Sequence, residues 1–281
     1  MIKRVFAFIV LLVILKMSSF SQISVTPPGL FITNDTRSGA ISVINNRYEA
    51  SEIEMELKFG YIGFDSLGRN SIVYDDKLIE ESCSIKPFVT FYPKKFILQG
   101  RQQQDVKFLV KNTNSLADGT YWTRIITRSK EVKKQIDTTN IQDSVKIDLT
   151  MILEYTTLLV FQKGKLNTNV DVSGLNVETD SMKLRLMFDF KRAGNSPFFG
   201  SAKVKILNSE GDKVAEKDEI LPIYFNSKKS IVFDKGLFKP GNYKVQIRLT
   251  DEQPDIPAEN KVPFVEMTKT FDFSFNPFIQ K

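Results

Sequence analysis

The sequence predicts an all-β protein built from antiparallel sandwiches. The first observation is a period of two, in which apolar and polar side chains alternate over several runs, so that each run has one apolar face. The second is that turn-forming residues separate these runs at short intervals. The third is that two of the runs open with the same local pattern, a turn followed by a tyrosine. Many short strands with frequent turns are typical of two-layered sheets.

The clearest alternation covers residues 53–61. Five apolar residues there alternate with polar residues or glycine, among them Glu52, Glu54 and Glu56. A helix would scatter the apolar residues around its surface, whereas a strand collects them on one face. We therefore predict a strand with the glutamates on its solvent face, although glutamate favours helices. The same alternation predicts further strands in the ranges 41–43, 106–110, 184–190, 202–206, 243–249 and 271–275. No helix longer than about two turns is expected.

Two tyrosines mark corresponding places in the two halves of the chain. Tyr121 follows the turn Asp118-Gly119, and Tyr243 follows the turn Pro240-Gly241. In immunoglobulin-like sandwiches a tyrosine in this position forms a tyrosine corner, in which its hydroxyl bonds to nearby backbone. The pattern therefore predicts two tandem immunoglobulin-like antiparallel sandwiches. We place the domains at 22–161 and 165–275, on either side of Gln162-Lys163-Gly164.

Residues 1–21 have the features of an export signal. A positive start at Lys3-Arg4 precedes eleven apolar residues, 5–15, and small residues then lead to Gln22. The run is shorter than the roughly 20 residues that span a bilayer, so we expect cleavage after Ser21 and no stable membrane insertion. A retained membrane anchor is the alternative. Removal of the segment lowers the net charge from +6 to +3, which is weak for nucleic-acid binding.

The composition excludes several classes of site. None of the 281 residues is histidine, which removes histidine-based triads, histidine-ligated zinc and a histidine general base. The single cysteine, Cys83, cannot form an intrachain disulfide or a thiolate cluster, and we expect it to be a small buried residue. No phosphate-binding loop of the Gly-x-x-x-x-Gly-Lys type is present. The sequence therefore predicts no metal, no cofactor and no enzyme.

The longest predicted strand covers residues 144–161. Its odd-numbered positions are apolar except at 157, whereas the even positions are polar up to Thr150 and largely apolar from Ile152 onwards. We expect the C-terminal half to be buried on both faces and the N-terminal half to have one apolar and one wet face. The strand follows the polar segment 129–143, which we interpret as a loop. The row of apolar odd-numbered side chains along this strand either covers the core of its own domain or pairs with another chain.

The first domain resembles the N-terminal domain of periplasmic pilus-assembly chaperones of the chaperone–usher type. The opening segment 23–27, the strand 40–46 that ends in Asn, and the segment 96–103 with the pattern Phe-Ile-Leu-Gln-Gly-Arg-Gln-Gln all match in order. The strand after Asp118-Gly119, the polar loop and the long alternating strand continue the match. The second domain resembles immunoglobulin-like sandwiches in general.

The resemblance implies donor-strand complementation, which requires no ATP. In this family the last strand of the first domain fills the gap left by a missing strand in a pilus subunit. By resemblance the inserted side chains are Val145, Ile147, Leu149 and Met151. The implied partners are pilin-like or other immunoglobulin-like envelope subunits, an outer-membrane usher is a further candidate, and the implied location is the periplasm.

One family feature is missing. Members hold the subunit's terminal carboxylate with an Arg on the first strand and a Lys on the last. Residues 24–31 contain no Arg or Lys, and Thr156 or Thr157 stands at the place of the Lys. Arg124 is a nearby cation that could substitute in the cleft, and its other interpretation is a solvated strand residue.

Two other classes of function compete with this one. A non-catalytic envelope or surface protein, structural or adhesive, could be built from the same two sandwiches and would act in the envelope, at the cell surface or after secretion. A chaperone should leave an apolar edge free, whereas a structural module should cover it. A glycosidase with paired carboxylates needs no histidine, but Glu52, Glu54 and Glu56 are expected to form a wet strand face.

Overall fold

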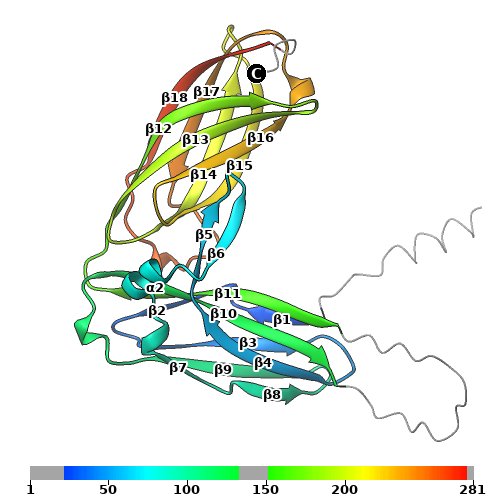
Figure 1. Cartoon of the computed structure of the whole chain (residues 1–281), viewed down its shortest axis with the longest axis vertical. Helices are drawn as coiled ribbons and strands as arrows, with labels where there is room; N and C mark the ends of the chain where they lie inside the picture. Colours follow the sequence, from blue (N-terminus) through cyan, green and yellow to red (C-terminus); the bar gives the residue numbers. More distant parts are fainter. Residues whose placement is uncertain (1–21, 133–150, 277–281) are drawn as a thin grey trace, which may run out of the picture.

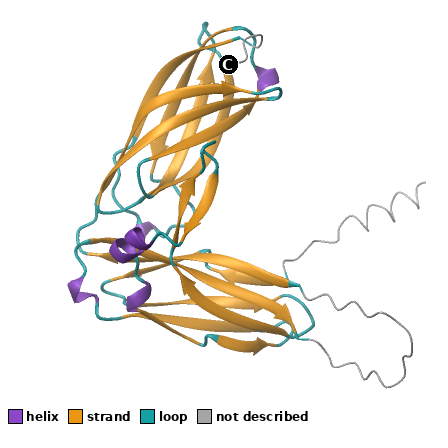
Figure 2. Ribbon diagram, viewed as in Figure 1, coloured by secondary structure: helices purple, strands orange, loops and turns teal. Residues whose placement is uncertain are grey.

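The computed structural model describes residues 22–132 and 151–276, which are folded mainly into strands joined by loops (Figure 2). The strands form two groups that are stacked along the long axis of the molecule (Figure 1). The chain passes from the first group to the second at Gly164, which has a left-handed backbone with φ of 64°. The predicted all-β fold of two immunoglobulin-like sandwiches is confirmed.

The first group contains two facing sheets. One has the strand order β1 (Ile23–Thr26), β3 (Ser38–Asn45), β9 (Gln103–Val110), β7 (Val89–Tyr92). The other has the order β2 (Gly29–Thr33), β11 (Ile152–Lys163), β10 (Gly119–Glu131), β4 (Ser51–Lys58), β8 (Lys95–Leu98). All pairs are antiparallel except β2 with β11. The inward side chains of both sheets form one core, which includes Ile41, Ile53, Val106, Leu159 and Phe161.

The second group also contains two facing sheets. One has the order β12 (Thr168–Thr179), β13 (Lys183–Gly194), β16 (Ser227–Asp234). The other has the order β15 (Lys213–Ile223), β14 (Phe198–Leu207), β17 (Gly241–Thr250), β18 (Met267–Phe275). Their core is separate from the first and includes Leu186, Phe188, Val204, Ile247 and Phe273. In β14, β17 and β18 the buried side chains follow the alternation of the sequence.

A hairpin and short helical turns lie outside the four main sheets. The hairpin consists of β5 (Gly60–Phe64) and β6 (Asn70–Tyr74). The helix α2 (Lys77–Cys83) follows it and is capped by Asp76, whose carboxylate accepts a hydrogen bond from Ile79 N. At seven residues α2 is the longest helix in the described ranges. The remaining turns are the 3-10 segments η1 (Lys86–Phe88), η2 (Thr113–Ser115), η3 (Lys235–Leu237) and η4 (Ala258–Asn260).

Both predicted tyrosine corners are present. Tyr121 donates from its hydroxyl to the carbonyl of Ala117 at 3.1 Å, and Tyr243 donates to the carbonyl of Lys239 at 2.7 Å. Each hydroxyl thus closes the turn four residues before it. The matching geometry supports the assignment of two sandwiches of the same class.

Two local predictions were wrong. The strand expected over residues 53–61 ends at Lys58, and a new pairing begins at Gly60, because the chain leaves the sheet and enters the hairpin. Phe59 at the break is buried and stacks on Trp122, with ring centroids 6.0 Å apart. Cys83 is partly exposed at the end of α2 rather than fully buried.

Candidate partner-binding edge

Strand β11 is covered unequally on its two sides. On one side it pairs with β10 along its whole length, from Ile152 opposite Lys130 to Lys163 opposite Gly119. On the other side β2 pairs only with residues 158–162. Within residues 22–132 and 151–276, no strand lies beside Ile152–Glu154 on the side away from β10. This end of β11 points away from the second sandwich (Figure 1).

The core-facing side of β11 becomes progressively less covered toward this end. Phe161 and Leu159 are fully buried, Thr157 is 3% exposed, and Tyr155 and Leu153 are half-buried. Met151, which has the same parity just before the strand, is 60% exposed. One continuous apolar face therefore begins inside the sandwich's own core and continues past its covered region. We call the segment Met151–Glu154 the open edge.

The opposite face of the same sheet is wet and charged. Arg128 lies between two carboxylates and pairs with Glu56 at 2.6 Å and Glu154 at 2.8 Å. Glu52 pairs with Lys95 at 2.8 Å and with Lys130 at 3.0 Å. The hydrogen bonds from these two lysines lower the pKa of Glu52 below its usual value. The prediction of a wet glutamate face on β4 is confirmed.

Ile152 lies on that wet face and is 59% exposed. The expectation that the strand is buried on both faces from Ile152 onwards is therefore wrong at this position. It holds farther along, where Val160 and Phe161 are both fully buried.

Only one of the four predicted donor residues lies in the described part of the chain. Met151 is exposed at the open edge, whereas Val145, Ile147 and Leu149 lie outside the described residues, as does the predicted signal segment 1–21. The insertion of these four side chains into a partner therefore stays a prediction. The open edge is the described end of the strip that they would continue.

Arg124 lies between the two sandwiches and is buried, with 6% of its surface exposed. Its Nε donates to the carbonyl of Gly60 at 3.2 Å, and its Nη2 donates to the hydroxyl of Tyr224 at 3.4 Å. Its interpretation as a solvated strand residue is wrong, because the second sandwich and the hairpin cover it.

An aromatic cluster joins the two halves, and no pattern in the sequence predicted it. Phe59 and Trp122 come from the first half and Tyr224 from the second, and all three are 2% exposed. The rings of Trp122 and Tyr224 lie 4.9 Å apart. Burial raises the pKa of Tyr224 to about 12, and its hydroxyl accepts a hydrogen bond from Arg124. Trp122 is therefore a core residue, and its core is the one between the sandwiches.

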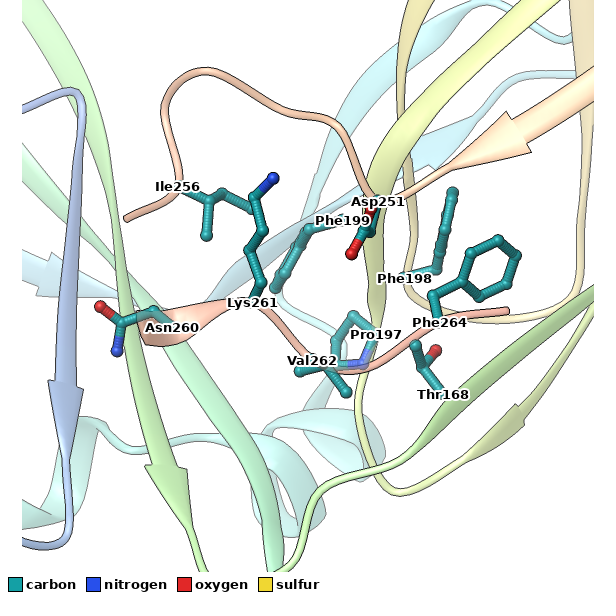
Figure 3. A pocket seen from close by; sticks show the side chains of 10 residues that line it. All are labelled: Thr168, Pro197, Phe198, Phe199, Asp251, Ile256, Asn260, Lys261, Val262 and Phe264. Carbon is teal, nitrogen blue, oxygen red and sulfur yellow. The ribbon is translucent and has the colours of Figure 1, made fainter. Parts of the chain in front are cut away.

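Two hollows lie near the contact between the two sandwiches. The smaller has a volume of about 10 Å³ and is enclosed by Phe198, Asn260, Lys261, Val262 and Phe264 among others (Figure 3). That is room for about one water molecule. The larger has about 490 Å³ and lies between the hairpin, α2 and the β15–β16 turn, where Tyr61, Asp76 and Phe225 line it. The described residues contain no group of three or more acidic or cysteine side chains that could hold a metal.

Comparison with known proteins gives matches only at the level of structure. No protein-family description and no curated protein matches the chain. Among solved structures, the YadV chaperone is 12% identical with a TM-score of 0.45, covering 89% of this chain and 100% of that one. A chain of the CsuC–CsuE chaperone–tip adhesion subunit pre-assembly complex of Acinetobacter baumannii is 9% identical with a TM-score of 0.45, covering 90% and 98%.

A third similar structure is the Salmonella enterica SafA pilin in complex with the SafB chaperone. The identity is 12% and the TM-score 0.42, with coverage of 92% of this chain and 98% of that one. Each of these TM-scores is below 0.5, so the assignment of function depends on the geometry of this chain. No helix in the described ranges has the length and apolar character needed to span a membrane.

Proposed function

We propose that the protein is a non-catalytic, ATP-independent chaperone of immunoglobulin-like envelope subunits, such as pilins, and acts by donor-strand complementation. The observation that carries the proposal is the decline in coverage along one face of β11, from the buried Phe161 to the exposed Met151. The open edge at Met151–Glu154 can accept a further strand, because β2 pairs with β11 only from Leu158 onwards. The proposed location is the periplasm, after export and removal of residues 1–21.

The proposed complex combines backbone pairing with side-chain insertion. A subunit strand would add to the edge of β11 through ladder hydrogen bonds, which tolerate many sequences. Val145, Ile147, Leu149 and Met151 would then fill the subunit's incomplete core. Burial of three or four such side chains contributes about 5–10 kcal/mol before the cost of ordering the strand. This is enough to hold a subunit without an energy source.

The proposed domains are residues 22–161 and 165–275, and the proposed binding strand is the last strand of the first. Arg124 remains a predicted cation of the region between them. To contact a subunit's carboxylate it must exchange its bonds to Gly60 and Tyr224 for the new partner. We therefore propose that the subunit is held mainly by the edge of β11. An outer-membrane usher is a further proposed partner.

The test is capture of the partner from the native envelope by the tagged protein. We compare the native chain with the double variant Ile147→Asp/Leu149→Asp, whose charges would be buried in a subunit core at high cost. The matched control is Ser144→Asp/Thr150→Asp, which places the same two negative charges on polar, even-numbered positions of the same segment. We expect the native chain and the control to capture a small immunoglobulin-like subunit that lacks a strand.

The core-face variant should capture none while keeping the native far-ultraviolet circular dichroism spectrum. Equal capture by both double variants would contradict the proposal. So would the absence of any strand-deficient subunit from the native capture. Either result would favour a structural or adhesive envelope module instead.

A further inference from the structure

The hairpin β5–β6 originates in the first sandwich but pairs with neither of its sheets. Its two strands form a separate two-stranded sheet, from Gly60 opposite Tyr74 to Phe64 opposite Asn70. It rises from the first sandwich and lies against the second (Figure 1). A two-stranded ribbon is only marginally stable by itself, so its conformation depends on what it contacts at each end.

The tip of the hairpin is bonded to β16 of the second sandwich. Ser230 N donates to the carbonyl of Gly68 at 2.9 Å, and Lys229 Nζ donates to Asn70 Oδ1 at 2.7 Å. The lysine side chain is only 7% exposed and also lies 3.5 Å from Glu219 Oε2. Because β16 is the last strand of the β12–β13–β16 sheet, the tip covers part of an edge that would otherwise offer its backbone groups to solvent.

Apolar contacts continue along the side of the hairpin. Phe64 packs against the core of the second sandwich, and Lys229 Nζ lies 5.6 Å from the centre of its ring. Tyr61 meets Phe225 edge to face, with ring centroids 5.0 Å apart. The hairpin is therefore attached to the second sandwich by backbone, polar and apolar contacts together.

The base of the hairpin is equally well fixed to the first sandwich. Arg124 Nε, on β10, donates to the carbonyl of Gly60. Tyr61 donates from its hydroxyl to Asp76 Oδ2 at 2.9 Å, and Asp76 in turn caps α2. Burial and the bond to Asp76 raise the pKa of Tyr61 to about 12, which keeps this donor protonated.

The other contacts between the sandwiches are the polar pairs beside the linker at Gly164 and the aromatic cluster around Trp122. Among the polar pairs, Thr120 Oγ1 is 2.6 Å from Ser196 Oγ, and Gln162 Nε2 donates to the carbonyl of Asn260 at 2.7 Å. The docked hairpin tip adds a further attachment, and each added attachment restricts the rocking of one body against the other. We propose that the β5–β6 hairpin is an internal strut that fixes the angle between the two sandwiches. This inference does not depend on the proposed function.

Gly68 offers a local way to release the strut. It has a left-handed backbone with φ of 68°, and a Cβ there would lie 2.3 Å from Ser230 N. Gly68→Ala must therefore move the tip away from β16. The matched control is Gly211→Ala in the β14–β15 turn, where φ is 91° and nothing lies within 4 Å of the added Cβ. Both variants place a Cβ on a backbone with positive φ, which is unfavourable, but only in Gly68→Ala does the Cβ meet a neighbour.

The first readout is hydrogen–deuterium exchange of the full chain, followed by mass spectrometry of the β16 peptide. Gly68→Ala should speed exchange at Ser230 by about tenfold or more, as local opening does, and the control should leave it unchanged. The second readout is the relative alignment of the two sandwiches from residual dipolar couplings. We expect one shared alignment in the native chain and in Gly211→Ala, and two separate alignments in Gly68→Ala.

A second variant keeps the test decisive if Gly68→Ala does not fold. Lys229→Met keeps an apolar side chain but removes the hydrogen bond to Asn70. Like Gly68→Ala, it should speed hydrogen exchange at Ser230 and give the two sandwiches separate alignments. Faster exchange with an unchanged shared alignment would show that the tip docks without setting the angle. That result, or native behaviour of both variants, would overturn the proposal.

Discussion

At the residue scale, burial rather than charge governs the groups between the sandwiches. Tyr224 is almost fully buried, and its ring packs among Trp122, Phe199 and Tyr61. Arg124 reaches it from the first sandwich and loses most of its exposure to water. The sequence marked Arg124 only as a cation, because nothing near it in the chain indicates that Tyr224 will cover it.

The buried phenol predicts a loss of stability at high pH. Burial holds the pKa of Tyr224 at about 12 in the folded protein, whereas an exposed tyrosine titrates near pH 10. As the pH rises above about 10, the unfolded state releases this proton first, so the free energy of unfolding falls. Two pKa units correspond to about 3 kcal/mol, lost progressively between about pH 10 and pH 12.

Urea denaturation across this pH range measures the effect. Tyr224→Phe cannot titrate, so its stability should decline less steeply with pH than that of the native chain. Tyr48→Phe is the control, because Tyr48 is 80% exposed, and it should follow the native curve. Parallel curves for the native chain and Tyr224→Phe would contradict the prediction.

At the element scale, β11 combines two roles along one face. Its C-terminal half is part of the core of the first sandwich, and its N-terminal end is the open edge. The sequence predicted the alternation, because parity is a local property of a strand. The expected strand covered residues 144–161, whereas β11 is Ile152–Lys163 and residues 133–150 lie outside the described ranges. It could not predict that the edge of β11 is paired with β2 only from Leu158 onwards, since β2 lies far away in the sequence.

The decline in coverage predicts that truncation of a side chain lowers the stability of the protein much more at one end of this face than at the other. Leu159→Ala removes a fully buried side chain and should cost about 2–5 kcal/mol of stability. Met151→Ala, at a residue that is 60% exposed, should cost less than about 0.5 kcal/mol. Chemical denaturation of the two variants checks this order. A large loss at Met151 would mean that this chain already covers the open edge.

At the scale of the whole molecule, three sets of contacts join the sandwiches. They are the polar pairs beside the linker, the aromatic cluster around Trp122 and the hairpin tip on β16. Together they predict that the two sandwiches unfold as one cooperative unit, because neither can open without exposing the cluster.

The single tryptophan makes this prediction measurable, since Trp122 lies inside that cluster. Its fluorescence and the far-ultraviolet circular dichroism should change at the same denaturant concentration. Phe199→Ala, which removes a ring packed on Tyr224, should separate the two transitions, with fluorescence changing first. Separate transitions in the native chain would mean that the sandwiches part before they unfold.

The sequence by itself determined most of the alternating strands, the buried faces of strands such as β9 and β17, and both tyrosine corners. These features depend on residues that are neighbours in the chain, such as Tyr243 and Lys239, four positions apart. The same local information identified the wet face of β4 and the alternating strip that continues into β11.

Only the tertiary structure decided which edge stays open, what covers Arg124 and where the hairpin docks. Each of these depends on contacts between distant parts of the chain. Lys229 and Asn70, for example, are 159 residues apart, and the open edge exists because β2 stops pairing at Leu158. Alternation fixes which side of a strand is apolar, but the packing of distant segments decides how much of that side remains uncovered.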